Sequence, residues 1–245
     1  MKAMILAAGL GTRLRPLTND RPKALVEING RTLLEITVER LKSFGAREII
    51  VNVHHHAEKI LDFLKSKKNF GVRIEISRED DLLLDTGGGL KKAAWFFLEN
   101  NSNEPFLVHN VDVLSTIDFQ QMFESHQKNS ALATLAVQER KSSRQLLFDD
   151  QGFLAGRRKG TSDSDEIVRP SANLHRLAFS GIHVVSPRLL NLITESGVFS
   201  IIDTYLRLAQ TSEKISAFRA DQFYWRDLGR PEDLAQASTD LENRE

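Results

Sequence analysis

Residues 2–13 read KAMILAAGLGTR, and the fold is predicted best from this stretch. An apolar run that breaks into glycines is typical of a buried strand that ends in a tight loop, where backbone N–H groups can approach an anion. Thr12 and Arg13 follow in the loop, and Lys23 comes slightly later. We predict a strand over 2–7 and a loop built to hold a triphosphate. A glycine turn with solvated basic residues is the simpler alternative.

The loop differs from two common phosphate-binding motifs. Leu14 stands where the dinucleotide-binding pattern Gly-x-Gly-x-x-Gly needs its third glycine, which disfavours a nicotinamide-dependent enzyme. The Gly-Lys-Ser/Thr ending of the ATPase and GTPase phosphate loop is absent as well. Another class of nucleotide-binding loop remains.

The composition is that of an ordinary globular chain, because 245 residues with 41% hydrophobic content can bury one sizeable core. The 33 basic and 33 acidic side chains balance, which disfavours attraction to nucleic acid or to a membrane. Cysteine is absent, so disulfides, thiolate nucleophiles and thiolate zinc sites are excluded. No apolar stretch approaches the roughly 20 residues of a membrane span, and Gly9 with Arg13 disfavours an export signal. We expect a cytoplasmic protein.

Short apolar runs alternate with helical patterns through the first half of the chain. This alternation is typical of parallel strands joined by crossover helices. Leu34, Val38 and Leu41 recur at helical spacing, and Gly45 is placed to end that helix. The predicted strands are 2–7, 48–53, 72–77 and 105–114, and the predicted helices are 32–44, 57–67 and 90–100, the last entered through a glycine-rich turn.

The pattern changes after Ser125. QLLFDDQGFLAG (145–156) carries a turn between apolar pairs and predicts a hairpin, so antiparallel or mixed strands are expected here. Residues 157–176 are polar and without apolar periodicity, which predicts a mobile surface loop. The other predicted strands are 131–139, 178–186, 215–220 and 223–229, and the predicted helices are 187–196, 201–211 and 231–242.

LAAGLGTRLRPLTNDRPKALVEING (6–30) resembles the N-terminal signature of the sugar-1-phosphate nucleotidyltransferases, in which a Gly-Thr-Arg loop precedes a Pro-Lys pair. The resemblance is strongest to short members of the family, those similar to mannose-1-phosphate guanylyltransferase and N-acetylmuramate-1-phosphate uridylyltransferase. It continues in order through LDTGGGL (84–90), VHNVDVL (108–114), FSGIHVV (179–185) and FYWRDLGRPEDL (223–234).

The resemblance and the alternating pattern together imply an α/β fold with a Rossmann-like, mixed but mainly parallel sheet flanked by helices, as in the nucleotide-diphospho-sugar (GT-A-like) transferases. No internal repeat or linker divides the chain, so we expect one domain over 1–245. Its nucleotide-binding half would cover about 1–115 and its sugar-binding half about 116–245. We expect no C-terminal β-helix domain.

The reaction that the resemblance implies is attack of a sugar phosphate oxygen on the α-phosphorus of a nucleoside triphosphate, which expels pyrophosphate. Two anions must meet, so the protein has to neutralise charge and fix an in-line geometry. The cations suited to this are Arg13 and Lys23, which we expect to be catalytic. The residues expected to bind the substrates are Ala8, Gly9, Gly11, Thr12, Thr86, Gly87, Gly88, Asn110, Ser180 and Gly181.

Asp112 and Asp227 are the residues to which the resemblance assigns a Mg²⁺ cofactor. Mg²⁺ typically takes one or two carboxylates while phosphate oxygens and waters complete its shell. Asp112 follows a predicted buried strand, and Asp227 comes just before a glycine. Either aspartate alone would also fit a turn or a helix cap. Many relatives have glycine where this chain has Val111, so the backbone approach there is expected to differ.

The acceptor side departs most from the family pattern. Many relatives carry a Glu-Lys-Pro segment that binds the sugar phosphate, and here only Arg169-Pro170 is a loose substitute. Asp85 replaces a residue that is often glycine, so the base preference is not inherited from the resemblance.

Two other clusters of side chains invite a functional interpretation. His54–His56 lie on an extended segment whose side chains alternate in direction, which disfavours a zinc site. Asn52 and His54 or His55 follow a strand and are expected to border the active site. Trp95, Phe96 and Phe97 suggest base stacking, but their place in an amphipathic helix favours core packing.

Two other functions remain open. One is a nucleotide-sugar sensor without turnover, against which the retained Arg13, Lys23, Asp112 and Asp227 argue. The other is a cytidylyltransferase acting on a non-sugar phosphate such as phosphocholine. The expected partners are a nucleoside triphosphate and a sugar 1-phosphate, with no nucleic acid and no membrane. The base, the sugar and the oligomeric state are left open.

Overall fold

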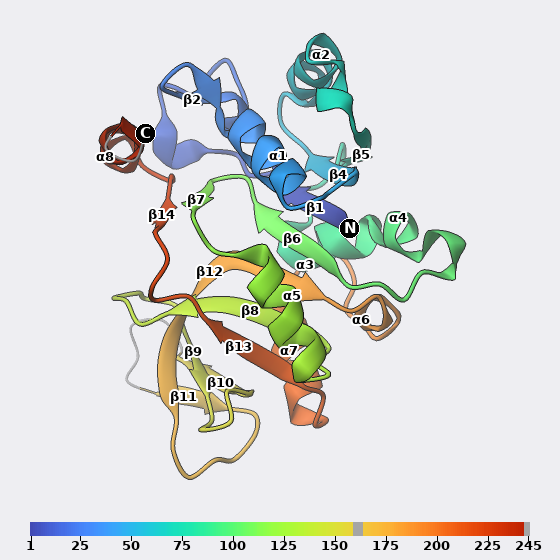
Figure 1. Cartoon of the computed structure of the whole chain (residues 1–245), viewed down its shortest axis with the longest axis vertical. Coiled ribbons are helices and arrows are strands. Elements are labelled where there is room, and N and C mark those ends of the chain that lie inside the picture. Colours follow the sequence, from blue (N-terminus) through green and yellow to red (C-terminus); the bar gives the residue numbers. More distant parts are fainter. Residues whose placement is uncertain (159–163, 243–245) are drawn as a thin grey trace.

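The computed structural model describes residues 1–158 and 164–242. A ten-stranded sheet runs through it in the order β11-β10-β9-β12-β6-β1-β4-β5, with β8 and β13 joined to β12 off this path (Figure 1). The strands of this sheet are β1 (Lys2–Leu6), β4 (Glu48–Val53), β5 (Arg73–Arg78), β6 (Phe106–Asn110), β8 (Ala133–Gln138), β9 (Gln145–Phe148), β10 (Leu154–Arg158), β11 (Asp165–Ile167), β12 (His175–Val185) and β13 (Ile215–Arg219).

The first half of the chain forms the parallel part of the sheet. β1 pairs in parallel with β4 and β6, and β4 pairs in parallel with β5. Leu6 lies opposite both Asn52 and Asn110, so the carboxyl ends of three strands meet at one edge. The prediction of parallel strands with crossover helices is confirmed. The expected strand over 105–114 is broken at Val111 and Asp112, because β7 (Val113–Ser115) leaves the sheet to pair with β14 (Trp225–Asp227).

Helices cover both faces of the sheet, and β1 shows how the sequence divides them. Ala3 and Ile5 point to a core shared with α1, α2 and α5, whereas Met4 points to a core shared with α4 and α7. This alternation of buried residues on one strand is what a sheet covered on both faces requires. The helices are α1 (Leu33–Ser43), α2 (Ala57–Ser66), α3 (Asp85–Lys92), α4 (Ala94–Leu98), α5 (Phe119–Lys128), α6 (Arg188–Asn191), α7 (Ile201–Gln210) and α8 (Pro231–Glu242).

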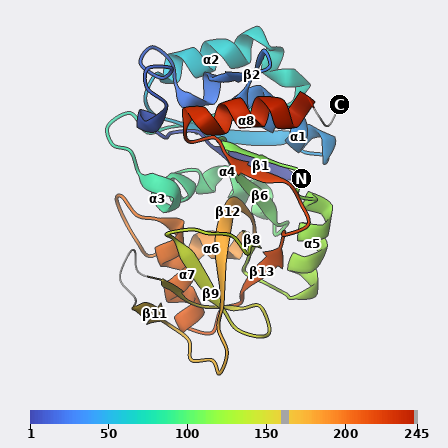
Figure 2. The same ribbon diagram turned by 90° about the vertical axis from the view of Figure 1, so that its left-hand side faces the viewer.

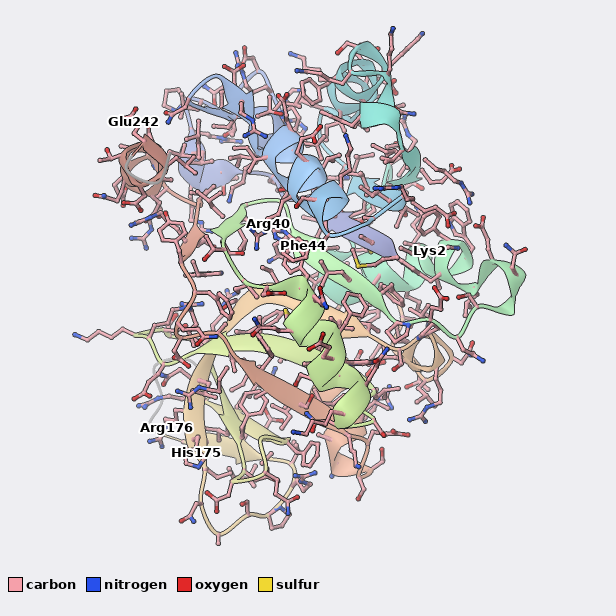
Figure 3. All side chains as sticks on the ribbon, viewed as in Figure 1. Lys2, Arg40, Phe44, His175, Arg176 and Glu242 are labelled. Carbon is pink, nitrogen blue, oxygen red and sulfur yellow. The ribbon has the colours of Figure 1, made fainter. Side chains whose placement is uncertain are left out.

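Helix α1 illustrates how local sequence sets the element bounds. The Thr32 hydroxyl accepts the Glu35 N–H at 3.1 Å and caps the start of the helix. Arg40 lies on the side of α1 that faces α5, where its guanidinium donates to the Ile117 carbonyl at 2.5 Å and lies over Phe119. Arg40 and Phe44 lie side by side in Figure 3. This contact ties the parallel half of the molecule to the α5 side.

The second half is antiparallel or mixed, as predicted. β12 is long enough to pair with β6 through Ile182–Val185 and with β9 through His175–Ala178, and it also pairs with β8. β13 runs parallel to β8. Outside this sheet, β2 (Glu27–Ile28) pairs with β3 (Arg31–Thr32), and α8 lies against β2 and β14 (Figure 2). The C-terminal helix is therefore packed on the N-terminal half.

The prediction of a surface loop over 157–176 is wrong for much of the part that the structure describes. Arg157 and Arg158 finish β10, β11 follows, and His175 begins β12, while 159–163 lie outside the described residues. Arg176 pairs with Asp165 at 2.8 Å. Figure 3 places His175 and Arg176 at the end of the molecule formed by β9, β10 and β11. Arg157 of β10 also pairs with Glu166 of the neighbouring β11 at 2.8 Å. Charged pairs between strands therefore take the place of the apolar alternation that the sequence lacks here.

Three other predictions are also corrected. The glycines expected in a turn before residue 90 lie inside α3, and a break at Ala93 separates α3 from α4. The helix expected over 187–196 is the single turn α6. Trp95, expected in the core with its neighbours, is 48% exposed, whereas Phe96 and Phe97 are buried. Within 1–158 and 164–242, no helix combines the length and apolar character needed to cross a bilayer.

Candidate active site

A pocket of about 340 Å³ opens at the carboxyl ends of β1, β4 and β6. Ligands of α/β sheets bind at this kind of edge, where neighbouring strands diverge. The pocket also receives residues from the start of α3 and from the loop before α7. Its lining residues are Leu6, Ala7, Ala8, Gly9, Lys23, Asn52, Leu83, Asp85, Thr86, Asn110, Val111, Asp112 and Val198.

The glycine loop after β1 is held by its own side chains. Gly11 has φ 65°, in the left-handed region, and the turn Thr12–Leu14 follows it. The Thr18 hydroxyl donates to the Gly11 carbonyl at 2.8 Å. Leu14 is fully buried, so the residue that departs from the dinucleotide pattern anchors the loop in the core. Ala8 and Gly9 line the pocket, as expected for substrate-binding residues, while Gly11 and Thr12 lie beyond its lining.

Lys23 reaches the pocket from the turn Lys23–Leu25, which begins after Pro22. Its ammonium lies 2.5 Å from Asp112 Oδ2, and the lysine is only 7% exposed. A mostly buried ammonium needs an anionic partner, and Asp112 supplies one. The two predicted functional residues, 89 positions apart, are therefore in direct contact.

Asp227 is placed beside Asp112 by the short β7–β14 ribbon. Asp227 is paired with Val113 in that ribbon, and the Leu228 N–H donates to the Asp112 carbonyl at 2.8 Å. Burial raises the pKa of Asp227 above its usual value, and the Asp112 carboxylate raises it further. Arg13 lies 4.0 Å from Asp227 Oδ1 with its side chain 60% exposed, so its guanidinium can also turn toward a ligand.

This donor set fits Mg²⁺. The Asp112 carboxylate raises the pKa of Asp227, so the two side chains lie close enough to disfavour each other's charge, and a bound divalent cation would relieve this repulsion. Among the residues that the structure describes, no cluster of three or more His, Asp or Glu side chains is arranged to hold a metal. Phosphate oxygens and waters would have to complete the shell, as they commonly do for Mg²⁺. Asp112 and Asp227 are thus suited to a metal that arrives with a nucleotide.

The start of α3 corrects the expected role of its glycines. The N–H groups of Gly87 and Gly88 both donate to the Phe199 carbonyl, at 3.0 and 3.3 Å, so they are not open to a nucleoside here. The Phe199 ring also explains the glycine at 87, where a Cβ would lie 2.4 Å from it. The Thr86 hydroxyl accepts the Ile201 N–H at 3.0 Å while Thr86 still lines the pocket. Phe199 and Val198 were not singled out from the sequence, because nothing local marks them.

Asp85 adopts φ 59°, which is the left-handed region that favours glycine. Its carboxylate accepts the Thr86 N–H at 2.6 Å, a local bond that helps an aspartate tolerate this conformation. Asp85 thus holds a backbone conformation that glycine adopts readily, and it adds a carboxylate to the pocket wall.

Two residues of β12, Ser180 and Gly181, were expected to bind the substrates, and their surroundings differ. Ser180 is fully buried and lies outside the pocket lining, and its carbonyl accepts the Trp225 indole N–H at 2.8 Å. Its expected contact with substrate stays a prediction. Gly181 has φ 73°, and a Cβ there would lie 2.8 Å from Asn110 Nδ2. Gly181 thus permits close packing against Asn110, which lines the pocket.

Arg169 does not substitute for the missing Glu-Lys-Pro segment. Its guanidinium binds the Asp149 carboxylate and lies over the Phe153 ring on the β9–β10 hairpin. Of the histidines after β4, His54 contacts the Glu79 carbonyl through Nδ1 at 2.5 Å. Asn52, expected to border the site, does line the pocket.

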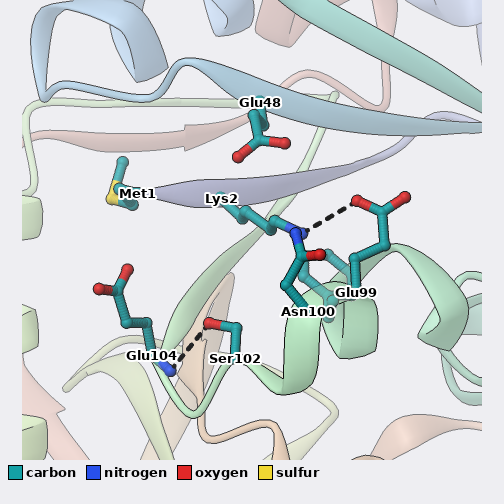
Figure 4. A pocket seen from close by; sticks show the side chains of 8 residues that line it. Met1, Lys2, Glu48, Glu99, Asn100, Ser102 and Glu104 are labelled. Carbon is teal, nitrogen blue, oxygen red and sulfur yellow. Dashed lines mark hydrogen bonds and ion pairs between the residues drawn. The ribbon is translucent and has the colours of Figure 1, made fainter.

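A second pocket of about 260 Å³ lies at the other end of β1 (Figure 4). Lys2 donates to Glu99 there, and Arg73 binds Glu48 and Glu99, so three charged side chains of its wall, Lys2, Glu48 and Glu99, are paired within the chain. The catalytic candidates do not line it. We assign the active site to the pocket at the carboxyl ends of the strands.

Comparisons with known proteins identify the family of the chain. Residues 2–148 match the family model described as nucleotidyl transferase. The chain is 32% identical over 238 residues to mannose-1-phosphate guanyltransferase of Yarrowia lipolytica, covering 96% of this chain and 62% of that protein. It is 32% identical over 242 residues to N-acetylmuramate alpha-1-phosphate uridylyltransferase of Caulobacter vibrioides, covering 94% of this chain and 92% of that protein.

A solved structure supports the fold. The chain superposes on HddC from Yersinia pseudotuberculosis, solved as a complex with GMP-PN, with a TM-score of 0.77 at 23% identity, covering 98% of this chain and 99% of that one. The expected nucleotide-diphospho-sugar transferase fold is therefore confirmed. The chain spans less than two thirds of the Yarrowia protein but nearly all of the Caulobacter protein. By its sequence match and by this fold, the chain belongs to the nucleotidyl transferase family.

Proposed function

We propose that this chain transfers a nucleotidyl group from a nucleoside triphosphate to a sugar 1-phosphate, with Mg²⁺ held by Asp112 and Asp227. The observation that carries the proposal is the convergence of Lys23, Asp112, Asp227 and Arg13 beside one pocket at the strand ends. Transfer between two phosphates needs cations and metal-binding carboxylates at a single point, and little else from the protein.

In the proposed reaction, an oxygen of the sugar phosphate forms a bond to the α-phosphorus, and the bond from that phosphorus to the β-phosphate oxygen breaks. Pyrophosphate leaves with the electron pair of that bond. The N–H groups of the loop from Ala8 to Gly11 would hold the triphosphate. Lys23, fixed by Asp112, would sit against the α-phosphate or the attacking phosphate. Mg²⁺, when bound, would neutralise phosphate charge.

Arg13 differs from Lys23 in freedom of movement. Its side chain is 60% exposed, and its only ion pair among the described residues is the 4.0 Å contact with Asp227. A guanidinium that is loosely held can close on phosphate oxygens with two parallel hydrogen bonds. Arg13 is therefore suited to the charge that develops on the leaving pyrophosphate, while Lys23 is suited to a fixed position.

The test is pyrophosphate release in Mg²⁺ with UTP, GTP, CTP and dTTP, each crossed with glucose 1-phosphate, mannose 1-phosphate, N-acetylmuramate 1-phosphate and phosphocholine. We expect release with one sugar phosphate, lowered about 100-fold or more by Asp112→Asn and by Lys23→Met. Arg21→Gln is the matched control, because Arg21 is an exposed cation of the same loop that pairs only with its neighbour Asp20 within the described residues. It should retain full activity.

Other outcomes would replace the proposal. Release with phosphocholine alone would make the chain a cytidylyltransferase for a non-sugar phosphate. Binding of a nucleotide sugar without any release would favour a sensor. Full activity of Asp112→Asn would remove the metal assignment.

A further inference from the structure

A buried pair of polar side chains joins the two walls of the active-site pocket. Asn52 lies in β4 and is 3% exposed, and Glu79 follows β5 and is 1% exposed. Asn52 Nδ2 donates to Glu79 Oε1 at 2.7 Å. No arginine, lysine or histidine within the described residues forms an ion pair with this carboxylate, so hydrogen bonds alone hold it.

Each end of the Asn52–Glu79 pair accepts a hydrogen bond from the backbone of a different pocket wall. Asn52 Oδ1 accepts the Ala7 N–H at 2.7 Å, at the point where β1 becomes the glycine loop. Glu79 Oε2 accepts the Leu84 N–H at 2.8 Å, immediately before Asp85 and Thr86. Ala7, Asp85 and Thr86 line the pocket, but Glu79 does not. Glu79 therefore contacts the site only through other residues.

The hydrogen bonds from Ala7 through Asn52 and Glu79 to Leu84 form a relay in which each donor faces one acceptor. The Ala7 N–H donates to Asn52 Oδ1, Asn52 Nδ2 donates to Glu79 Oε1, and the Leu84 N–H donates to Glu79 Oε2. Glu79 must therefore present two acceptors, which only a carboxylate can do. Helix α3 closes the relay, because a Cβ at Gly89 would lie 2.8 Å from both Asn52 Nδ2 and Glu79 Oε1.

We propose that Glu79, acting through Asn52, is a positioning residue that fixes the spacing between the phosphate loop and the start of α3. The inference rests on the proposed function for its catalytic consequence, but the coupling of the two walls is a property of the protein alone. Breaking the pair leaves a buried donor without an acceptor, and both walls then lose their common anchor.

Isosteric substitutions test the relay without changing its volume. Glu79→Gln places an amide NH₂ against another donor, and Asn52→Asp places a carboxylate against the Glu79 carboxylate. The double variant Asn52→Asp/Glu79→Gln restores every match, because the new amide can donate to the new carboxylate and accept the Leu84 N–H, while that carboxylate accepts the Ala7 N–H. Ser77→Ala is the control, since Ser77 is buried in β5 and its hydroxyl has no hydrogen-bond partner in the described part of the chain. Ser77 also lies opposite Asn52 in the sheet, close to the pair.

The first measurement is amide hydrogen exchange of the ligand-free variants, which requires no turnover. We expect Glu79→Gln to speed exchange about tenfold or more at both Leu84 and Ala7, and the double variant to restore protection at both. Faster exchange at Leu84 alone would overturn the coupling, as would a double variant that exchanges faster than either single variant. If both single variants fail to fold, folding of the double variant is the rescue, and its failure to fold refutes the relay.

The second measurement separates positioning from stability. With the substrates that the pyrophosphate assay identifies, we expect KM for the nucleoside triphosphate to rise about tenfold in Glu79→Gln, with a smaller change in kcat, and to stay unchanged in the Ser77→Ala control. A KM unchanged by Glu79→Gln while exchange is coupled would remove the positioning role. Absence of turnover in the unmodified protein would contradict the proposed function, and hydrogen exchange would then decide whether the relay couples the two walls.

Discussion

Substitution of Gly229 by alanine should lower catalytic activity strongly while changing the stability of the fold very little. An added Cβ would lie 2.4 Å from Asp227 Oδ1 and 2.6 Å from Arg13 Nη2, whereas ordinary contact begins at 3.4 Å. Both atoms are the ends of side chains, so they can retreat without moving the backbone. In Gly229→Ala we therefore expect the Asp227 carboxylate to shift by about 1 Å, a misplacement that can cost about 100-fold in kcat/KM.

The cost in stability should be small. Arg13 and Asp227 are 60% and 43% exposed, so the displaced groups can be solvated, and the free energy of unfolding should change by less than about 1 kcal/mol. The assay is pyrophosphate release alongside urea denaturation, with Arg230→Ala as the control for a change in the adjacent exposed side chain. Activity within threefold of the unmodified protein would refute the assignment of Asp227 and Arg13. A loss of several kcal/mol would refute the argument that the clash is relieved by side chains.

Three further predictions concern the core and the loop. Burial lowers the pKa of three histidines, to about 4, 4 and 3 in His109, His126 and His183. These histidines stay neutral in the folded state, whereas the unfolded chain takes up protons below about pH 6.5. Their contribution to the free energy of unfolding is therefore fully present above that pH and is lost on acidification, by about 2 kcal/mol per histidine at pH 5. Urea denaturation at pH 7 and 5 checks this, and equal stabilities would contradict it. Gly87→Ala should lose about 1–3 kcal/mol against the Phe199 ring in the same denaturation assay, whereas Gly9→Ala, with no atom within 4 Å of its Cβ, should lose less than about 1 kcal/mol. In steady-state kinetics, Lys23→Met should raise KM for the triphosphate as well as lower kcat, because Lys23 lines the pocket. An unchanged KM would mean that Lys23 contacts the substrate only in the transition state.

The parallel half was predictable from the sequence because its signals are local. β1 and β4 are short apolar runs covered on both faces, and α1 begins at a capping threonine. The positions of Asp112 and Lys23 followed from the family motifs. Their contact at 2.5 Å followed from neither motif, since it depends on where the Lys23–Leu25 turn packs.

The second half was less predictable because its strands are specified by long-range pairing. β11 carries charged residues whose partners lie on other strands: Glu166 pairs with Arg157 of the neighbouring β10, and Asp165 pairs with Arg176 of β12. Seen locally, such a segment has the composition of a loop. The prediction of a helix over 187–196 failed for a related reason. Apolar residues at helical spacing indicated a buried segment there, but the single turn α6 is enough to bury them.

The glycines of α3 show why a motif alone does not identify a ligand. A run of glycines before a helix predicts close approach, and the sequence cannot say what approaches. Here the Phe199 carbonyl accepts the N–H groups of Gly87 and Gly88. The Phe199 ring fills the space beside Gly87, and the Gly197 carbonyl fills the space beside Gly88. A nucleoside could use those N–H groups only if the 197–201 segment moved. Because that segment also supplies Val198 to the pocket wall, any such movement would reshape the pocket together with the start of α3.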